Sequence, residues 1–492
     1  MSWEERGASG RSGPERLERS GSEAGRPVVR VVWDGRTRRW SDGRYLAGGV
    51  PWGLLRLSPE ARDIADRLRS CGRAGFLPVT PAERTLVHLL VDRGVAHPAP
   101  EPRSVTADEV LVIIPVFGRA DLLEACLASV GRVPVIVVDD ASPNPDDIRR
   151  VSQAHGATLI RHAVNQGPGA ARNTALAITD APIVAFLDSD CRAPARWLEE
   201  LLPHFDDPRV GLIAPRVRPR PAGRSLLARH EDARSALDMG ARPELVRHGA
   251  RLGFLPSAAL VARRAALPVG GFEPTMRVGE DVDLVWRTID AGWHARYEPT
   301  VTVLHEMRLA PLAWARRRLE YGTSASVLDR RHPGRLAPAK ISAWNLAIAV
   351  IATARRPVPA AGVAAIAVTS LGRGLARSGV PAELAVRVVA KGLMADVLGV
   401  GHALRREWWP LGWFGLATAR RSRWAKLATI SMTAPILLEY LRNRPPVDPI
   451  RYTALRLLED AAYGSGVLLS VVRTRSPRAL VPQVRWPRSR RP

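Results

Sequence analysis

The feature of the sequence that most constrains the fold is a series of short, wholly apolar runs in the middle of the chain. Residues 110–115, 135–138 and 183–187 form such runs, and helix-like segments separate them. A strand that is apolar on both faces is typical of a parallel sheet covered by helices on both sides. Because parallel strands need long crossover connections, this alternation predicts an α/β domain over residues 109–310.

Acidic residues directly follow two of these predicted strands. Asp188 and Asp190 form an Asp-x-Asp motif after the third run, and Asp139 and Asp140 follow the second. The carboxyl ends of strands in an open parallel sheet border its ligand crevice. Two carboxylates one residue apart supply hard oxygen ligands for Mg²⁺ or Mn²⁺, usually completed by substrate phosphates. The motif alone is weak, because acidic triplets are frequent in surface loops and turns.

A glycine-rich segment lies between the two acidic strand ends. Gly167 and Gly169 permit a close approach of backbone to ligand, and the helix that starts there directs its N–H groups at an anion. The planar guanidinium of Arg172 adds N–H donors that suit phosphate or ribose oxygens. The structural alternative is an ordinary helix start with a buried arginine.

A second carboxylate pair, Glu280 and Asp281, precedes a predicted helix about ninety residues after the Asp-x-Asp motif. A carboxylate at a helix start is commonly a partner of the helix dipole. Presented to a ligand instead, Asp281 can take the proton of an acceptor hydroxyl as a general base. Further along, His305 could add a metal ligand and Arg308 a diphosphate contact, although single residues of these types are more often structural.

In their order, these elements resemble the motifs of the family-2 glycosyltransferases with the GT-A fold. The matching stretches within residues 108–310 are 113–117, 138–142, 165–173, 188–190, Gly271-Phe272 and Glu280-Asp281. The resemblance implies an inverting, metal-dependent sugar transfer from a UDP-sugar, in a GT-A nucleotide-sugar-binding domain.

The same resemblance implies a role for individual residues. Pro115 and Asp140 would line the pocket for the nucleotide base, and Arg172 and Asp188 would contact the nucleotide sugar. Asp190 would bind the metal that bridges the diphosphate. Asp281 would be the catalytic base.

Residues 28–97 predict a small α+β module ahead of this domain. A β-branched run ends at Asp34-Gly35, a dipeptide that favours a hairpin. Ser58 and Thr80 each begin a helix signature, and Thr80 also starts a capping box. The preceding residues 1–27 are typical of a disordered leader, and they lack the apolar segment of a secretory signal. Residues 98–108 are typical of a proline-rich linker.

The C-terminal region, residues 311–492, is predicted to be helical and basic. Residues 401–492 contain 16 arginines and one lysine against five acidic residues, so half of the net charge of +24 lies there. The apolar stretches 341–354 and 358–371 are interrupted before the roughly 20 residues that a spanning helix needs. Tryptophans interleaved with arginines favour a helix at an anionic membrane surface, on the cytoplasmic side. A packed helical subdomain with a basic face explains the same pattern.

The whole arrangement resembles the glycosyltransferase family of the actinobacterial mycofactocin system. That resemblance implies transfer of glucose from UDP-glucose, in a β-1,4-linked chain, onto a peptide-derived redox cofactor precursor. Residues 28–97 are also similar to the peptide-binding modules of peptide-maturation enzymes. Many processive family-2 members carry a Gln/Arg-x-x-Arg-Trp motif, and the stretch that begins at Trp314 departs from it.

Two other functions fit parts of the sequence. One is a glycosyltransferase of cell-envelope polysaccharide or glycolipid synthesis. The other is a nucleic-acid-binding protein, which the positive charge favours. We expect no nucleic-acid partner, because aromatic residues make up only 5% of the chain and the acidic strand ends repel phosphate. Three widely spaced cysteines exclude a disulfide framework.

Overall fold

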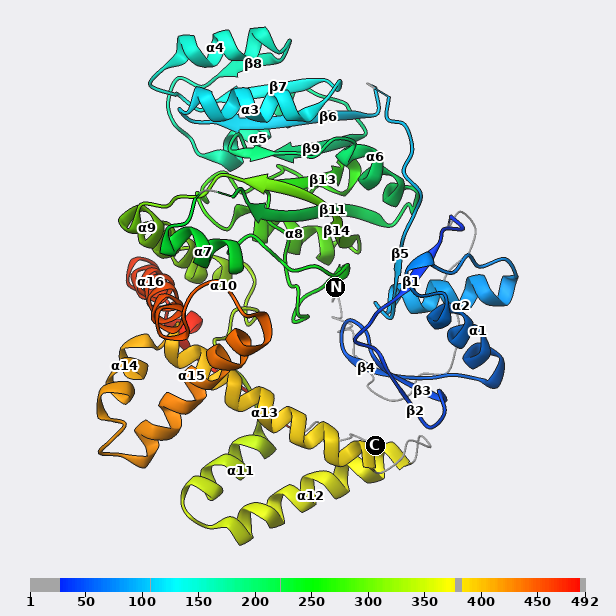
Figure 1. Ribbon diagram of the computed structural model, residues 1–492, viewed down its shortest axis with the longest axis vertical. Helices are drawn as coiled ribbons and strands as arrows, with labels where there is room; N and C mark the ends of the chain where they lie inside the picture. Colours follow the sequence, from blue (N-terminus) through cyan, green and yellow to red (C-terminus); the bar gives the residue numbers. More distant parts are fainter. Residues whose placement is uncertain (1–26, 107, 222, 377–382, 487–492) are drawn as a thin grey trace, which may run out of the picture. The chain divides into compact units, whose positions relative to one another are not determined.

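The computed structural model describes residues 27–106, 108–221, 223–376 and 383–486 (Figure 1). The predicted leader lies outside these residues, apart from Pro27. The described chain divides into two compact units. One contains the residues up to Glu101 together with Asp206–Pro208 and Val368–Arg387, and the other contains the rest.

The first unit is built from two small sheets and two helices. They are β1 (Val31–Trp33), β2 (Arg38–Trp40), β3 (Tyr45–Gly48), β4 (Gly53–Arg56), α1 (Pro59–Ser70), α2 (Pro81–Asp92) and β5 (Ala96–Pro98). The strands β2, β3 and β4 pair in sequence, whereas β1 pairs with β5. The hairpin predicted at Asp34-Gly35 is therefore wrong. Asp34 accepts a hydrogen bond from the Thr37 hydroxyl and lies 3.8 Å from His97, so the turn is bound to the β5 strand.

Both predicted helix starts in this unit are confirmed. The Ser58 hydroxyl accepts a hydrogen bond from the Ala61 N–H at 3.1 Å. Thr80 and Glu83 form the reciprocal capping box, with N–H to side-chain distances of 3.2 and 3.0 Å. These bonds satisfy N–H groups that would otherwise lack a partner at the start of a helix.

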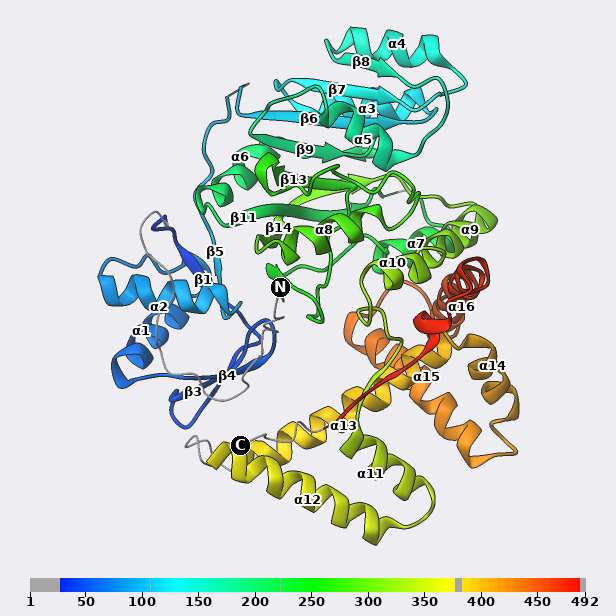
Figure 2. The same cartoon turned by 180° about the vertical axis from the view of Figure 1, so that it is seen from behind.

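The second unit contains a nine-stranded mixed sheet in the order β10-β14-β11-β13-β9-β6-β7-β8, with β12 paired to β14 (Figures 1 and 2). Its strands are β6 (Val110–Val116), β7 (Val135–Asp139), β8 (Thr158–Arg161), β9 (Ile183–Leu187), β10 (Cys191–Arg192), β11 (Val210–Pro219), β12 (Glu244–Val246), β13 (Ala259–Arg263) and β14 (His294–His305). The three apolar runs form the parallel strands β6, β7 and β9, as predicted. The strand β8, which was not predicted, pairs in parallel with β7. The antiparallel strand β13 then ends this group.

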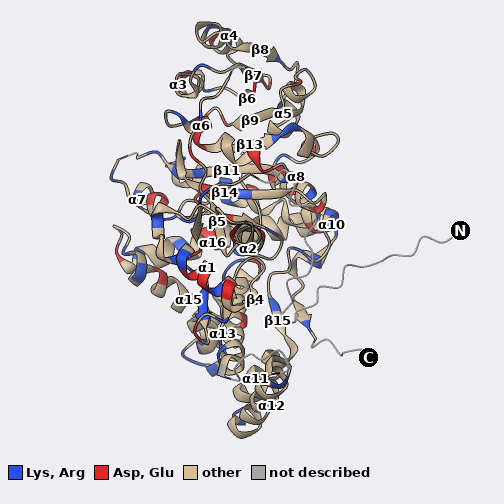
Figure 3. Ribbon diagram, turned by 90° about the vertical axis from the view of Figure 1, so that its right-hand side faces the viewer, with Lys and Arg blue, Asp and Glu red and all other residues tan. Residues whose placement is uncertain are grey.

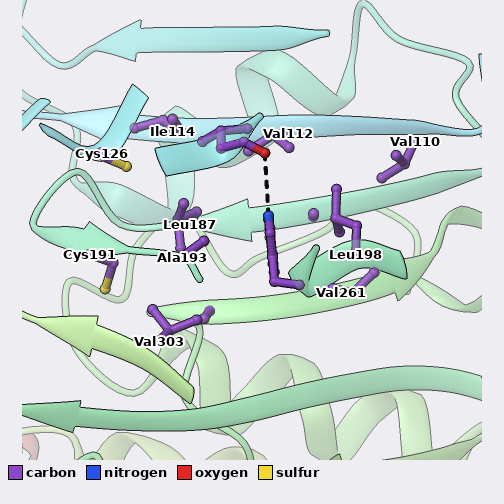
Figure 4. Close-up of a cluster of buried hydrophobic side chains, with 14 of the residues drawn as sticks. Val110, Val112, Ile114, Cys126, Leu187, Cys191, Ala193, Leu198, Val261 and Val303 are labelled. Carbon is purple, nitrogen blue, oxygen red and sulfur yellow. Dashed lines mark hydrogen bonds between the residues drawn. The ribbon is translucent and has the colours of Figure 1, made fainter. Parts of the chain in front are cut away.

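Helices cover both faces of the parallel group, as its apolar strands require. These helices are α3 (Ala120–Val130), α4 (Pro145–Ala154), α5 (Pro168–Leu176), α6 (Trp197–Leu201) and α8 (Glu280–Asp290). Val110, Val112 and Ile114 share one core with residues of α3, α4 and α6 (Figure 4). Leu111 and Ile113 share the other core with residues of α5 and α8. Successive residues of a strand point to opposite faces, which explains this division.

The C-terminal region is helical, as predicted. Its helices are α9 (Pro311–Gly322), α10 (Ala325–Arg331), α11 (Ala343–Thr353), α12 (Pro357–Ala376), α13 (Glu383–Arg405), α14 (Trp409–Thr418), α15 (Arg423–Asn443) and α16 (Pro449–Thr474). One described helix, α12, is by its length of 20 residues and its composition long and apolar enough to cross a membrane. The expectation that this stretch is too short is wrong. Pro357 and Pro359 fall in the first turn, where a missing N–H does not break the helix.

A buried charge network joins α9 and α16 to α7 (Leu226–Ala233). Arg318 donates to Glu231 at 2.5 Å and to Glu459 at 3.0 Å. The Trp314 indole also donates to Glu231, at 2.6 Å. Removing one partner of such a buried pair commonly costs about 3–5 kcal/mol, because the other charge is left uncompensated. The network therefore binds the C-terminal helices to the sheet domain.

The helices α9 and α16 also approach each other closely at two glycines. A Cβ atom on Gly466 would lie 2.0 Å from the Leu319 carbonyl oxygen, and one on Gly322 would lie 2.0 Å from the Tyr463 carbonyl oxygen. Only hydrogen atoms fit in these positions. The spacing of the two helices thus depends on the absence of side chains there.

We expect Gly466→Ala to destabilise the protein by about 1–3 kcal/mol, because the helices must move apart to admit the methyl group. The matched control is Gly399→Ala in α13, where no atom lies within 4 Å of the added Cβ. That change should be neutral or stabilising by up to about 1 kcal/mol through helix propensity. Thermal unfolding measures both, and equal shifts in the melting temperature would contradict the close approach.

Candidate active site

The candidate site lies at the carboxyl ends of β6, β7 and β9. Because these strands are parallel, their carboxyl ends share one edge of the sheet. Asp139 ends β7, and Asp188 follows β9 directly. The hydrogen bond from the Asp188 N–H to the Ala258 carbonyl, at 2.9 Å, ties this turn to the start of β13.

Pro115 is buried within β6, where it pairs in register with Val138 of β7. Two residues later the chain leaves the strand, and the Gly118 N–H donates to the Ser142 hydroxyl at 2.7 Å. The loops that follow β6 and β7 are therefore connected. The Asp140 N–H donates to the carbonyl of Val116, the residue after Pro115, at 2.9 Å. The assignment of Pro115 and Asp140 to one base pocket stays a prediction.

The Asp140 carboxylate holds the glycine-rich loop. It accepts hydrogen bonds from the N–H groups of Gln166 and Gly167, at 2.8 and 2.7 Å, and lies 2.8 Å from the His162 ring. The side chain is almost fully buried, with 4% of its surface exposed. These hydrogen bonds from Asp140 to the loop were not predicted from the sequence. The proposed contact of Asp140 with a nucleotide base stays a prediction.

Arg172 lies at the centre of the site. Its guanidinium donates to Asp188 at 2.6 Å and to Glu280 at 3.1 Å, and lies over the Phe272 ring at 5.1 Å. It is 1% exposed, and its Nε has no hydrogen-bond partner in the described chain. One arginine on α5 therefore connects the Asp-x-Asp turn to the start of α8.

The neighbouring Asn173 fixes the Gly271-Phe272 segment. Its side chain donates to the Phe272 carbonyl at 2.7 Å and accepts from the Phe272 N–H at 2.8 Å. Gly271 has a φ of +65°, and a Cβ there would lie 2.4 Å from the Asn173 side-chain oxygen. Two motifs about a hundred residues apart in the sequence are thus parts of one contact.

The carboxylates at the start of α8 have raised pKa values. Burial raises the pKa of Glu280 to about 7, and the charge of Asp281 contributes while Arg172 opposes the shift. Burial also raises the pKa of Asp281, against hydrogen bonds from the N–H groups of Ser257 and Val282 at 3.2 and 2.8 Å. Raised pKa values are common among groups that exchange protons with a substrate.

A residue that the sequence did not single out anchors α8. Asp283 is fully buried and binds Arg287 and Arg331, each at 2.7 Å, and His332 at 2.9 Å. Although burial opposes it, these bonds hold the pKa of Asp283 far below its usual value. Asp283 therefore fixes the helix turn that carries Asp281. Its position two residues after Asp281 was the only signal in the sequence.

Strand pairing brings His305 to Asp190. The short strand β10 pairs with the end of β14, with Cys191 opposite His305. The His305 Nε2 lies 3.4 Å from the Asp190 carboxylate, and both side chains are partly exposed. Burial alone would raise the pKa of Asp190, but the hydrogen bond and charge of His305 lower it overall. For the same reason the pKa of His305 is raised, although its burial opposes the shift.

These residues fit a divalent cation only as a partial ligand set. Within the described residues, no group of three or more His, Cys, Asp or Glu side chains could hold a metal ion. A carboxylate and an imidazole suit Mn²⁺, and an open set of this kind leaves positions for diphosphate oxygens. Asp190 and His305 would therefore hold the ion together with the donor.

Comparison with known proteins places this chain in a family. Residues 111–267 match the model of glycosyl transferase family 2. The pre-mycofactocin glycosyltransferase of Mycobacterium tuberculosis is 38% identical over 469 residues, which cover 92% of this chain and 97% of that protein. The glycosyltransferase AglE of Haloferax volcanii is 28% identical over 211 residues, covering 40% of this chain and 67% of that protein.

Among solved structures, a mannosyltransferase of Pyrobaculum calidifontis in complex with GDP-Man and Mn²⁺ matches with 19% identity and a TM-score of 0.40. The match covers 75% of this chain and 90% of that one. The predicted family and α/β fold class are confirmed by the family model and by the mycobacterial relative. The chain belongs to glycosyltransferase family 2, and it is a sugar-transferring enzyme.

Proposed function

We propose that the protein transfers glucose from UDP-glucose to the peptide-derived precursor of mycofactocin, with inversion at the sugar carbon. The observation that carries the acceptor assignment is the 38% identity to the pre-mycofactocin glycosyltransferase over almost the full length of both chains. The assignment of UDP-glucose, β-1,4 linkage and inversion rests on the family resemblance. The small module at residues 28–97 is proposed to bind the peptide portion of the acceptor.

In the proposed reaction, Asp281 is the general base. The acceptor hydroxyl gives its proton to the Asp281 carboxylate, and its oxygen bonds to the anomeric carbon of the sugar. The bond from that carbon to the diphosphate breaks, and its electron pair leaves with UDP. Hydrogen bonds from two backbone N–H groups orient the base. A single base suffices, because no covalent sugar intermediate forms in an inverting transfer.

Arg172, Asp188 and Asp190 are proposed to hold the donor. Arg172 keeps Asp188 in place from the buried side, so the outer part of this carboxylate remains available to the nucleotide sugar. Asp190 and His305 would hold Mg²⁺ or Mn²⁺. Such a cation, when bound, offsets the charge of the departing diphosphate.

We propose that the enzyme works at the cytoplasmic face of the membrane, since exposed apolar and basic side chains coincide in its C-terminal helices. A transferase of envelope polysaccharide or glycolipid remains the competing assignment. Incubation with UDP-glucose, Mn²⁺ and either the peptide-derived or a lipid-linked acceptor distinguishes the two by UDP release and product mass. UDP release with the lipid-linked acceptor alone would exclude the mycofactocin assignment.

Asp281→Asn should lower the transfer rate by about two to four orders of magnitude, because the amide cannot accept the hydroxyl proton. Binding of UDP with Mn²⁺, measured by titration calorimetry, should stay within about twofold of wild type, since the donor contacts are retained. A large loss of donor affinity in this variant would assign Asp281 to donor binding instead.

Asp190→Asn should weaken Mn²⁺-dependent UDP binding at least about tenfold, because a charged metal ligand becomes neutral. UDP binding without Mn²⁺ should change little. The control is Asp146→Asn, the same substitution at an exposed position of α4. If Mn²⁺ strengthens UDP binding to Asp190→Asn as much as to wild type, Asp190 does not bind the metal.

The pH dependence of transfer should report on the ionisation of Asp281. Asp281 must be ionised to act, so activity falls as the pH drops through its raised pKa. Asp188→Asn removes a negative charge that contributes to this raised pKa and should lower the pKa of Asp281, which moves the acid limb of kcat/KM to lower pH. Glu124→Gln, at an exposed position of α3, should leave the profile unchanged. An acid limb that stays in place in Asp188→Asn would show that the charge of Asp188 does not act on Asp281.

A further inference from the structure

We infer that one face of α15 docks in the plane of an anionic lipid leaflet, with α14 beside it. This inference deepens the proposed membrane association and rests on it for its biological setting. Its physical basis is independent of the reaction, because it concerns a helical hairpin that contains none of the proposed site residues. We refer to the surface as the α15 face. It comprises Trp424, Leu427, Ile430, Leu437, Leu438 and Leu441.

The α15 face is apolar and exposed, and its residues extend from the first to the last turns of the helix. Its six side chains are between 43% and 66% exposed. They recur at intervals of one, three or seven residues, which places them within a single stripe of an α-helix. From Trp424 to Leu441 the stripe runs about 25 Å at 1.5 Å per residue. Exposed apolar side chains scattered singly are ordinary, but a stripe of this length marks an interaction surface.

The opposite side of α15 is packed against the rest of the protein. Met432 and Ile436 are completely buried and share a core with Tyr452 of α16. Gly415 of α14 lies against α15, and a Cβ on it would stand 3.7 Å from the Ala428 side chain. The orientation of α15 is therefore fixed. Its exposed face cannot turn inward without breaking this core.

Basic side chains border both ends of the α15 face. Arg420 and Arg421 lie in the connection from α14, and Arg423 and Lys426 lie in the first turn of α15; all four are exposed. At the other end, Arg442 and Arg444 are also exposed. Figure 3 colours the acidic and basic residues of the chain, including those of α15. Anionic headgroups complement this pattern, because arginine and lysine reach the headgroups while the apolar side chains enter the acyl region.

Acidic residues do not compete with the lipid on this face. Glu439 is the one acidic residue in α15, and its carboxylate accepts from the Tyr452 hydroxyl at 3.0 Å and lies 3.3 Å from Arg234. It thus belongs to the packed side. With 21 residues α15 is long enough to cross a membrane, but among the described helices α12 alone is also apolar enough, so α15 fits the membrane plane rather than a span.

The α14 helix extends the apolar surface. Leu411, Phe414 and Leu416 are 66%, 70% and 37% exposed, and no residue of α14 is charged. Phe414 and Trp424 are aromatic side chains of the kind that settle at the level of lipid headgroups. The two helices pack against each other and are joined by the arginine-rich connection (Figure 2). Both therefore offer apolar side chains near this connection.

The test measures binding of the full-length protein to vesicles by flotation. Phosphatidylcholine vesicles with one quarter phosphatidylglycerol should bind the protein, and pure phosphatidylcholine vesicles should bind it far less. Leu438→Glu with Leu441→Glu should weaken binding at least about tenfold, because burying these two side chains supplies much of the affinity. Replacing Arg420, Arg421 and Arg423 by Gln should weaken it about fivefold per charge at low salt and reduce its salt dependence.

The matched control carries the same two charges elsewhere: Ile178→Glu with Val269→Glu, at positions that are 61% and 104% exposed in the sheet domain. This control should bind vesicles like wild type. Equal loss in both double variants, or undiminished binding of Leu438→Glu with Leu441→Glu, overturns the inference. Wild-type protein that is dimeric in solution and becomes monomeric only in the α15 variant would assign the face to a second copy instead.

UDP release with a water-soluble acceptor, measured without vesicles, separates this inference from the proposed function. The α15 variants should keep the wild-type rate, because their substitutions lie outside the proposed site. A wild-type protein that binds vesicles but transfers no sugar contradicts the proposed function alone. A protein that transfers sugar and ignores anionic vesicles contradicts the docking surface alone.

Discussion

The candidate active site depends on a single buried guanidinium. Arg172 is 1% exposed, and its guanidinium donates hydrogen bonds to Asp188 on one side and to Glu280 on the other. Burying an arginine without such partners would be costly, and these two carboxylates satisfy its N–H groups. The turn after β9 and the start of α8 are consequently held at a fixed separation. Arg172 therefore contacts both Asp188, which is proposed to bind the donor, and Glu280, which is next to the proposed base Asp281.

Around this contact, the site is assembled from the backbone of loops that side chains hold in place. Asp140 fixes the glycine-rich loop through two N–H groups, and Asn173 fixes the segment at Phe272 in the same manner. Asp283 holds α8 from its buried side. Each of these residues acts on a loop or a helix start, and the strands serve as the rigid base. A site of this kind is preorganised before any substrate arrives.

Much of the fold could be predicted from local patterns in the sequence. The apolar runs correctly predicted three parallel strands, and the capping residues Ser58 and Thr80 correctly predicted two helix starts. The order of the motifs led to the family. The pairing of β1 with β5 could not be predicted, because it joins segments that lie more than 60 residues apart and replaces a local hairpin that the turn residues favoured. The contacts of Glu280 and Asp140 were missed for the same physical reason, since each is made to residues distant in sequence.

The pairing of β10 with β14 has a consequence for the order of folding. Asp190 and His305 come within 3.4 Å of each other only when the last strand of the sheet has joined. During synthesis the chain must therefore grow by about 115 residues after Asp190 before its partner exists. The parallel strands and their acidic turns can form earlier, from segments that emerge together. A truncated or partly folded domain without β14 therefore lacks this pair, the two residues proposed to hold the cation.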